Sequence, residues 1–227
     1  MIPPNAYVTL EHEYILVFRN GETSRSFPPG DDQRYEAAYF WEERNRWFTD
    51  LWTDVTGTLQ ALESDDHSGG DSDGRRDDDP SLTDLRERSA AYPLEIPYRL
   101  CNMYSAYGDT VLDPFWGTGT TSLAAMCAGR NSVGCELEDG FRDVFDERVG
   151  DLPALSRSIA EGRLERHRSF VERQRATADG TRLEYEADHY GVPVVTAMES
   201  GIRLYTVDSV QATEVGYRAS HRPLESE

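Results

Sequence analysis

Residues 111–121, VLDPFWGTGTT, carry the residue types that most suggest chemistry. Two apolar residues lead to Asp113, and two glycines, Gly117 and Gly119, stand one residue apart before a run of hydroxyl residues. A strand that turns through closely spaced glycines into a helix lets a ligand approach the backbone, because the amides at the helix N-terminus point outward. The stretch therefore predicts a ligand site at the carboxyl end of a strand.

Three ligand classes could use such a turn. A P-loop needs Gly-x-x-x-x-Gly-Lys-Ser/Thr, and the chain contains no lysine. A dinucleotide fingerprint needs Gly-x-Gly-x-x-Gly, whereas Gly119 is followed by Thr-Thr-Ser with no third glycine. S-adenosylmethionine carries no pyrophosphate at its methionine end and needs no phosphate cradle, so it is the candidate that remains.

Residues 113–121, DPFWGTGTT, resemble motif I of the amino-group DNA methyltransferases, which typically reads Asp-Pro-Phe-x-Gly-x-Gly-Thr-Thr. A second expected strand ends at Glu136, roughly 20 residues further on, where an acceptor for ribose hydroxyls is expected. Upstream, residues 88–94, RSAAYPL, resemble the family's motif X. The resemblance covers about residues 5–140 and implies an α/β, Rossmann-like S-adenosylmethionine-dependent methyltransferase fold with an incomplete sheet and a target-recognition insertion.

This resemblance also implies a cofactor site for S-adenosyl-L-methionine. The glycine turn lines the methionyl pocket, the second-strand acid takes the ribose hydroxyls, and motif X closes over the methionine carboxylate. The predicted cofactor-binding residues are Asp113, Phe115, Gly117, Gly119, Thr120, Thr121, Glu136, Ser89, Tyr92 and Pro93. Neither a metal nor a covalent intermediate is implied, and no cysteine lies in a Pro-Cys setting.

The family's catalytic element, a Ser/Asn/Asp-Pro-Pro-Tyr/Phe/Trp loop, is absent from residues 1–227. That loop accepts hydrogen bonds from the exocyclic amine of a flipped base and stacks an aromatic ring on it. The prolines of 2–5, 28–30 and 113–114 lack its polar, paired-proline and aromatic order. No catalytic residue is therefore assigned.

In the β-type motif order, the catalytic loop comes before the motifs found here. The expectation is an N-terminally truncated or split enzyme that methylates the amine of cytosine (N4) or adenine (N6), with motif X favouring cytosine slightly. Three alternatives stay open: a non-catalytic cofactor- and DNA-binding half that complements a separate catalytic subunit, an inactive truncated enzyme, and a methyltransferase that acts on RNA or another substrate. The predicted partners are double-stranded DNA and either a complementing N-terminal subunit or a second copy.

Charge is the unusual global feature. The formal net charge is −19, and every basic residue except histidine is arginine. Such a surface indicates adaptation to high salt, where dense carboxylates keep a protein hydrated, so the acid excess does not exclude DNA. Local arginines must then make the contacts, and Arg34, Arg44 and Arg46 are the predicted DNA-binding residues. The three unclustered cysteines, and the lack of a signal peptide or membrane span, favour reduced thiols in a cytoplasmic core.

The elements that must position the site follow from periodicity. Tyr14–Phe18 is apolar and β-prone and predicts a buried strand, and residues 32–51 predict an amphipathic helix. Further helices are expected over 93–107, 120–128 and 155–176, strands over 110–112 and 131–135, and two or three strands within 192–217. Gly129 is expected to stop the helix between the two strands.

Four segments are expected in the chain. Residues 1–25 form a remnant strand of the catalytic half, and 26–88 form a target-recognition-like region with a disordered acidic linker at 63–80. Residues 89–140 form the cofactor-binding β-α-β core, and 141–227 add a helix and C-terminal strands.

Overall fold

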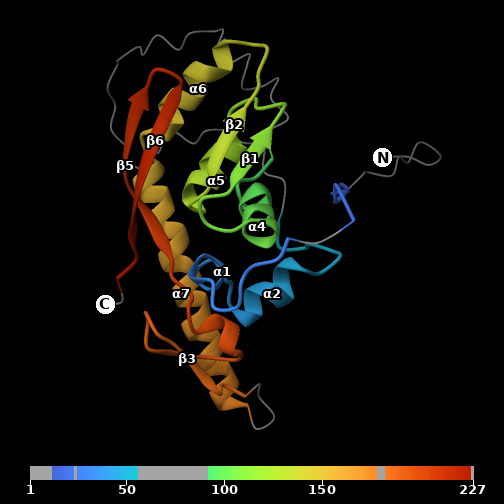
Figure 1. The fold of residues 1–227 in the computed structure, drawn as a ribbon, viewed down its shortest axis with the longest axis vertical. Coiled ribbons are helices and arrows are strands. Elements are labelled where there is room, and N and C mark those ends of the chain that lie inside the picture. Colours follow the sequence, from blue (N-terminus) through green and yellow to red (C-terminus); the bar gives the residue numbers. More distant parts are fainter. Residues whose placement is uncertain (1–11, 23–24, 56–91, 178–181, 226–227) are drawn as a thin grey trace, which may run out of the picture.

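The computed structural model describes residues 12–22, 25–55, 92–177 and 182–225 (Figure 1). Its elements, in chain order, are α1 (Asp32–Glu36), α2 (Trp41–Trp47), α4 (Glu95–Tyr104), β1 (Thr110–Asp113), α5 (Thr120–Cys127), β2 (Asn131–Gly134), α6 (Gly140–Val149), α7 (Leu152–Ala176), β3 (Tyr185–Ala187), β4 (Val192–Val194), η1 (Ala197–Glu199), β5 (Tyr205–Thr213) and β6 (Gly216–Pro223). The acidic linker predicted at 63–80 lies outside the described residues.

The central unit is a parallel βαβ. Strands β1 and β2 pair in register from Thr110 opposite Asn131 to Asp113 opposite Gly134, and α5 connects them. The helix ends where predicted, because Gly129 takes a left-handed φ of +70° and a side chain there would meet the Tyr107 ring. This unit confirms the predicted α/β, Rossmann-like class, with a parallel sheet of two strands in the described part of the chain.

One face of this sheet is packed and the other is open. Val111 lies on the inner face, toward α5, in a core with Leu123, Ala124 and Leu152. On the outer face, Leu112 and Val133 stand opposite each other in the register and are 64 % and 52 % exposed. Parallel sheets are normally covered on both faces. Within the described ranges, no element covers this apolar pair.

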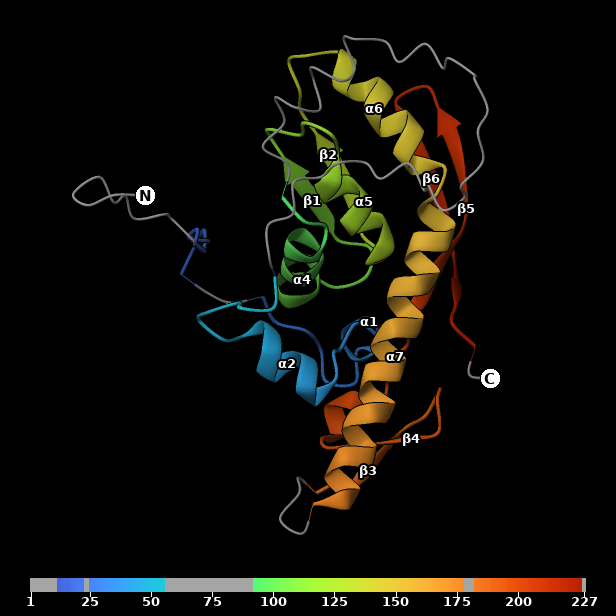
Figure 2. The ribbon, with the colours of Figure 1, turned by 180° about the vertical axis from the view of Figure 1, so that it is seen from behind.

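Helix α7 connects the upper and lower parts of the molecule. Seen from behind in Figure 2, it runs along the molecule past α5 and the β5–β6 hairpin to β3 and β4. Its lower half packs in a second core, with Phe40, Leu164, Val194 and Ile202.

A buried ion-pair network, made of Glu42, Glu43, Arg163 and His167, joins α2 to α7. The Arg163 guanidinium donates to both Glu43 carboxylate oxygens at 2.7 Å, and both residues are buried. His167 Nδ1 lies 3.0 Å from Glu42 Oε1, and its ring stacks on Phe40 with centroids 4.0 Å apart. The network fixes α2 to the long helix.

Two predictions about the N-terminal part were wrong. Tyr14–Phe18 is exposed and belongs to no strand, since no described strand lies beside it to pair with. The helix expected over 32–51 is two short helices, α1 and α2, interrupted at 37–40. Phe40 adopts an extended backbone there because its ring packs on His167, a contact that helical geometry at this position would move.

Candidate functional site

The cofactor turn, residues 114–119, connects β1 to α5 through two left-handed glycines. Gly117 has φ +52° and Gly119 has φ +74°. A Cβ on Gly119 would lie 2.2 Å from the Phe145 ring, whereas a Cβ on Gly117 would meet nothing within 4 Å. Gly119 is therefore required by packing, and Gly117 leaves open space above its backbone, as a closely approaching ligand needs.

Trp116 supports the turn from beneath. Its indole N–H donates to the Ser122 hydroxyl at 2.8 Å, and its ring packs against Phe145 with centroids 4.7 Å apart. Its backbone N–H donates to the Cys135 carbonyl, which ties the turn to the end of β2. Gly134 allows this arrangement, because a Cβ there would lie 2.2 Å from the indole.

Glu136 reaches from the end of β2 to the cofactor turn. Its carboxylate accepts the Gly117 N–H at 2.7 Å and the Leu137 and Glu138 N–H groups at 2.8 and 3.1 Å. These bonds, the one from Glu138 above all, hold the pKa of the Glu136 carboxyl below its usual range. An ionised acceptor therefore stands beside the glycine turn, and its role as a ribose-binding acid stays a prediction.

The motif X segment reaches the first turn of α5, next to the cofactor turn. The Tyr92 hydroxyl lies 2.5 Å from the Thr121 hydroxyl in the first turn of α5. Partial burial raises the pKa of Tyr92, and the nearby Asp113 carboxylate raises it further. Pro93 precedes α4 and is half-buried. Ser89, predicted from the same motif, lies outside the described residues.

The other predicted cofactor residues differ in exposure. Asp113 Oδ1 accepts the Phe115 N–H at 3.1 Å, which shapes the start of the turn, and the Phe115 side chain is 89 % exposed. Thr120 is buried, and its hydroxyl lies 3.2 Å from the Arg148 guanidinium. That hydroxyl supports the turn from within the fold and does not face the open side.

Arg148, on α6, was not singled out from the sequence. Its guanidinium donates to the Thr118 carbonyl at 2.8 Å and to the Thr118 and Thr120 hydroxyls, so it clamps the cofactor turn from the helix that follows β2. Burial lowers its pKa. No local pattern separates it from the other arginines of this helix-rich segment.

A cleft of about 630 Å³ adjoins Glu136 on the β2 side. Trp116, Gly134 and Glu136 line one wall, and Phe145 of α6 and Tyr217 of the β5–β6 hairpin belong to the other. Its volume lies in the range of small-molecule sites. Of the predicted cofactor residues in the described ranges, Glu136 lines this space, which is of suitable size for a nucleoside, and the glycines of the turn do not line it.

The three predicted DNA-binding arginines do not share one setting. Arg34 and Arg44 line a second cleft, of about 830 Å³. Arg46 lies outside this lining, with its guanidinium 3.7 Å from Asp54 and 3.9 Å from Glu95. The structure brings two of the three together and separates the third.

A βαβ unit with a glycine turn and an acid at the adjacent strand end defines a nucleoside-cofactor type of α/β chain. The chain belongs to the DNA methylase family, whose model matches residues 1–147. None of the helices in the described ranges combines the length and apolar character that a membrane crossing needs.

Individual relatives of the chain carry methyltransferase names. The type II methyltransferase M.MthZI of Methanothermobacter thermautotrophicus is 46 % identical over 207 residues, 90 % of this chain and 51 % of the relative. M.MjaI of Methanocaldococcus jannaschii is 44 % identical over 149 residues, 66 % of this chain and 42 % of the relative. The chain spans about half the length of these curated relatives.

Among solved structures, a putative DNA modification methylase from Thermus thermophilus, complexed with S-adenosyl-L-methionine, is 32 % identical. The match covers 64 % of this chain and 46 % of that one, with a TM-score of 0.46.

Proposed function

We propose that this chain is the cofactor-binding part of an S-adenosylmethionine-dependent DNA methyltransferase that modifies the exocyclic amine of cytosine or adenine in a double-stranded DNA site. The observation that supports the proposal most is the hydrogen bond from the Gly117 N–H to the Glu136 carboxylate, which joins the segments that follow β1 and β2. The family and the type II relatives support DNA as the substrate.

The described residues fit the cofactor at both of its ends. The backbone of Gly117, with open space above it, and the motif X residue Tyr92 would hold the methionine end. The ionised Glu136 would accept the ribose hydroxyls. When bound, the cofactor supplies a sulfonium methyl group, and the protein's part is to orient it and to exclude water.

The base-binding loop must come from outside residues 1–227, because these residues hold no Pro-Pro-aromatic tetrapeptide. The open sheet face at Leu112 and Val133, and the exposed apolar segment Tyr14–Phe18, offer surfaces for the polypeptide that carries the loop. We infer that this polypeptide is a complementing subunit or segment. A second copy of the chain, the alternative partner, would cover these surfaces but would bring no such loop.

The composition supports a proposal for the cellular compartment. A net charge of −19 without lysine favours a salt-adapted cytoplasm, where the chromosome and the cofactor both occur.

Calorimetric titration of the chain with S-adenosyl-L-methionine tests the proposal. Glu136→Gln should weaken binding about tenfold or more, because a charged acceptor of two hydroxyls is lost. Glu161→Gln, at an exposed position of α7 outside the lining of the cleft, should bind within about twofold of the unchanged chain. Equal affinities for both variants would contradict the assignment of Glu136.

Methylation assays test the second part. The chain alone should transfer no methyl group to DNA or RNA, and mixing it with a polypeptide carrying a Ser-Pro-Pro-Tyr-type loop should restore transfer to DNA. Robust transfer by the 227-residue chain alone would overturn the need for an outside loop, and transfer to RNA alone would favour the RNA alternative.

A further inference from the structure

The second cleft gathers arginines in a chain that is otherwise strongly acidic. Four of its lining residues are Arg19, Arg25, Arg34 and Arg44, which come from different stretches of the N-terminal part. We name this site the arginine cleft. On a protein of net charge −19, a concentration of guanidinium groups makes the local electrostatic potential positive, and a positive site selects an anionic ligand.

Three of these guanidinium groups are available to a ligand. Within the described part of the chain, no carboxylate lies in ion-pair range of Arg19, Arg34 or Arg44. Arg25 pairs with Asp109. The one carboxylate in the lining, Glu199, is already engaged by the Trp41 and Thr196 N–H groups.

Aromatic rings support three of the four arginines. The Arg25 and Arg34 guanidiniums lie over the Phe27 ring, at 4.3 and 5.9 Å from its centroid. Arg44 lies 5.7 Å from the centroid of Trp41. Such stacking keeps like charges close together before a ligand arrives, and it does not use the N–H groups in the guanidinium plane, which can donate to a ligand where no carboxylate engages them.

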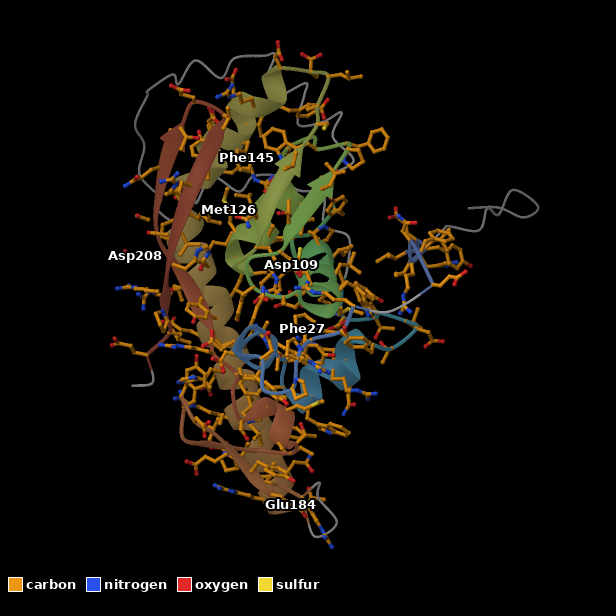
Figure 3. All side chains as sticks on the ribbon, viewed as in Figure 1. Phe27, Asp109, Met126, Phe145, Glu184 and Asp208 are labelled. Atoms are coloured by element: carbon orange, nitrogen blue, oxygen red, sulfur yellow. The ribbon has the colours of Figure 1, made fainter. Side chains whose placement is uncertain are left out.

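The arginine cleft and the cofactor turn lie at opposite ends of β1. Residues 102–106, which line the cleft, shortly precede β1, and the turn directly follows it. Figure 3 shows Phe27 and Asp109 close together below β1, with Phe145 near the other end of the sheet. A four-residue strand separates the two sites by about 10 Å or more. A group held in the cleft is therefore not the one that receives the methyl.

We infer that the arginine cleft binds the sugar–phosphate backbone of the DNA substrate, away from the target base, and reads no sequence. The choice of DNA over another polyanion rests on the proposed function. Guanidiniums on aromatic supports suit phosphates spaced along a strand, and contacts of this kind set affinity and register without discriminating bases. By the same reasoning, Arg46 makes no DNA contact, because it lies outside the arginine cleft and within ion-pair range of Asp54 and Glu95, which also bind Arg99.

Fluorescence anisotropy with labelled duplex DNA, at several salt concentrations, tests the inference on the full chain. Arg34→Gln and Arg44→Gln should each weaken binding roughly fivefold near ~0.15 M salt and lower the slope of log K against log salt by about 1. The effect should be the same for duplexes of different sequence. Cofactor affinity should not change in either variant.

Two matched controls keep the test specific. Arg46→Gln removes a paired arginine two residues from Arg44, and Arg173→Gln removes an exposed arginine at the far end of α7. Both should leave the salt slope unchanged. Circular dichroism and cofactor titration on every variant separate a lost contact from a lost fold.

The outcomes are distinguishable. If the chain binds cofactor but no DNA at any salt, the DNA part of the proposed function fails. If it binds DNA and the Arg34 and Arg44 variants match the controls, the cleft assignment fails while the proposed function stands. Binding of an acidic peptide or of anionic vesicles in preference to DNA, lost in the same variants, would also overturn the assignment.

Discussion

The cofactor turn and the buried ion-pair network both depend on a glutamate carboxylate, but one carboxylate is exposed to a cleft and the other is enclosed in the fold. At the turn, Glu136 is ionised and exposed, and it accepts three backbone amides beside an open cleft. In the network, Glu43 is equally ionic but is enclosed with Arg163 between two helices. The first arrangement leaves a carboxylate for a ligand, and the second uses one to fix the fold. The comparison teaches that enclosure, rather than charge, separates a binding acid from a structural one.

Removing the enclosed acid should have the largest effect. Glu43→Ala leaves a buried guanidinium unpaired and should lower the free energy of unfolding by about 3–5 kcal/mol in urea titrations. Burial alone would lower the pKa of Arg163, but the charge of Glu43 raises it well above its ordinary value, so the arginine stays charged. Glu161→Ala, at an exposed pair with Arg157, is the control and should cost less than about 1 kcal/mol. A similar small cost for Glu43→Ala would break the comparison.

The two glycines of the turn should separate stability from binding. Gly119→Ala should cost about 2–4 kcal/mol, from the left-handed backbone and from the collision with Phe145. Gly117→Ala should cost about 1–2 kcal/mol, because only the backbone term applies. Cofactor titration should show the opposite order. Gly117→Ala should lose more affinity than its small loss of stability suggests, because its methyl group occupies space that the ligand needs. Equal losses of stability would show that Gly119 is not confined by its neighbours.

The pH dependence of stability should trace to His167, with a smaller effect. Burial lowers the pKa of His167, but the hydrogen bond and charge of Glu42 outweigh it and leave the pKa raised. A raised folded pKa means that the stabilisation is complete below about pH 6.5 and is lost as pH rises through the folded value. Urea midpoints should fall over that interval, and Glu42→Gln should flatten the curve. A midpoint that rises with pH in this interval would contradict the assignment.

The smallest expected effect is on stability, because a thiol reagent tests the exposure of the cysteines without unfolding the chain. Burial raises the pKa of Cys101 to about 11 and of Cys127 to about 12, and Cys135 at the end of β2 is exposed. A thiol reagent should therefore modify one cysteine in the native chain and three after denaturation. The sequence placed all three in a core, and Cys135 corrects this. Modification of two or three thiols in the native chain would show that the core around α5 opens.

Local chemistry explains what could be predicted from the sequence. The turn glycines, the stop at Gly129 and the acid at Glu136 each depend on neighbours within a few residues, and each lies where its pattern indicated. Features set by distant contacts could not be predicted. The break before α2 depends on His167, and the position of Arg46 outside the arginine cleft goes with its ion pairs to Asp54 and Glu95. The predicted burial of Tyr14–Phe18 requires neighbouring strands, and the apolar pattern of the segment itself does not reveal whether such strands are present.

Trp116 makes the turn visible to spectroscopy. The chain has four tryptophans, and the other three, Trp41, Trp47 and Trp52, belong to the α2 segment. The Trp116 indole is hydrogen-bonded to Ser122 and lies against Gly134, so its emission reports on the joint between the two strand ends. A difference spectrum against Trp116→Phe would isolate that signal. The molecule thus carries an intrinsic optical probe beside its candidate cofactor site, and titration with S-adenosyl-L-methionine can be followed without any label.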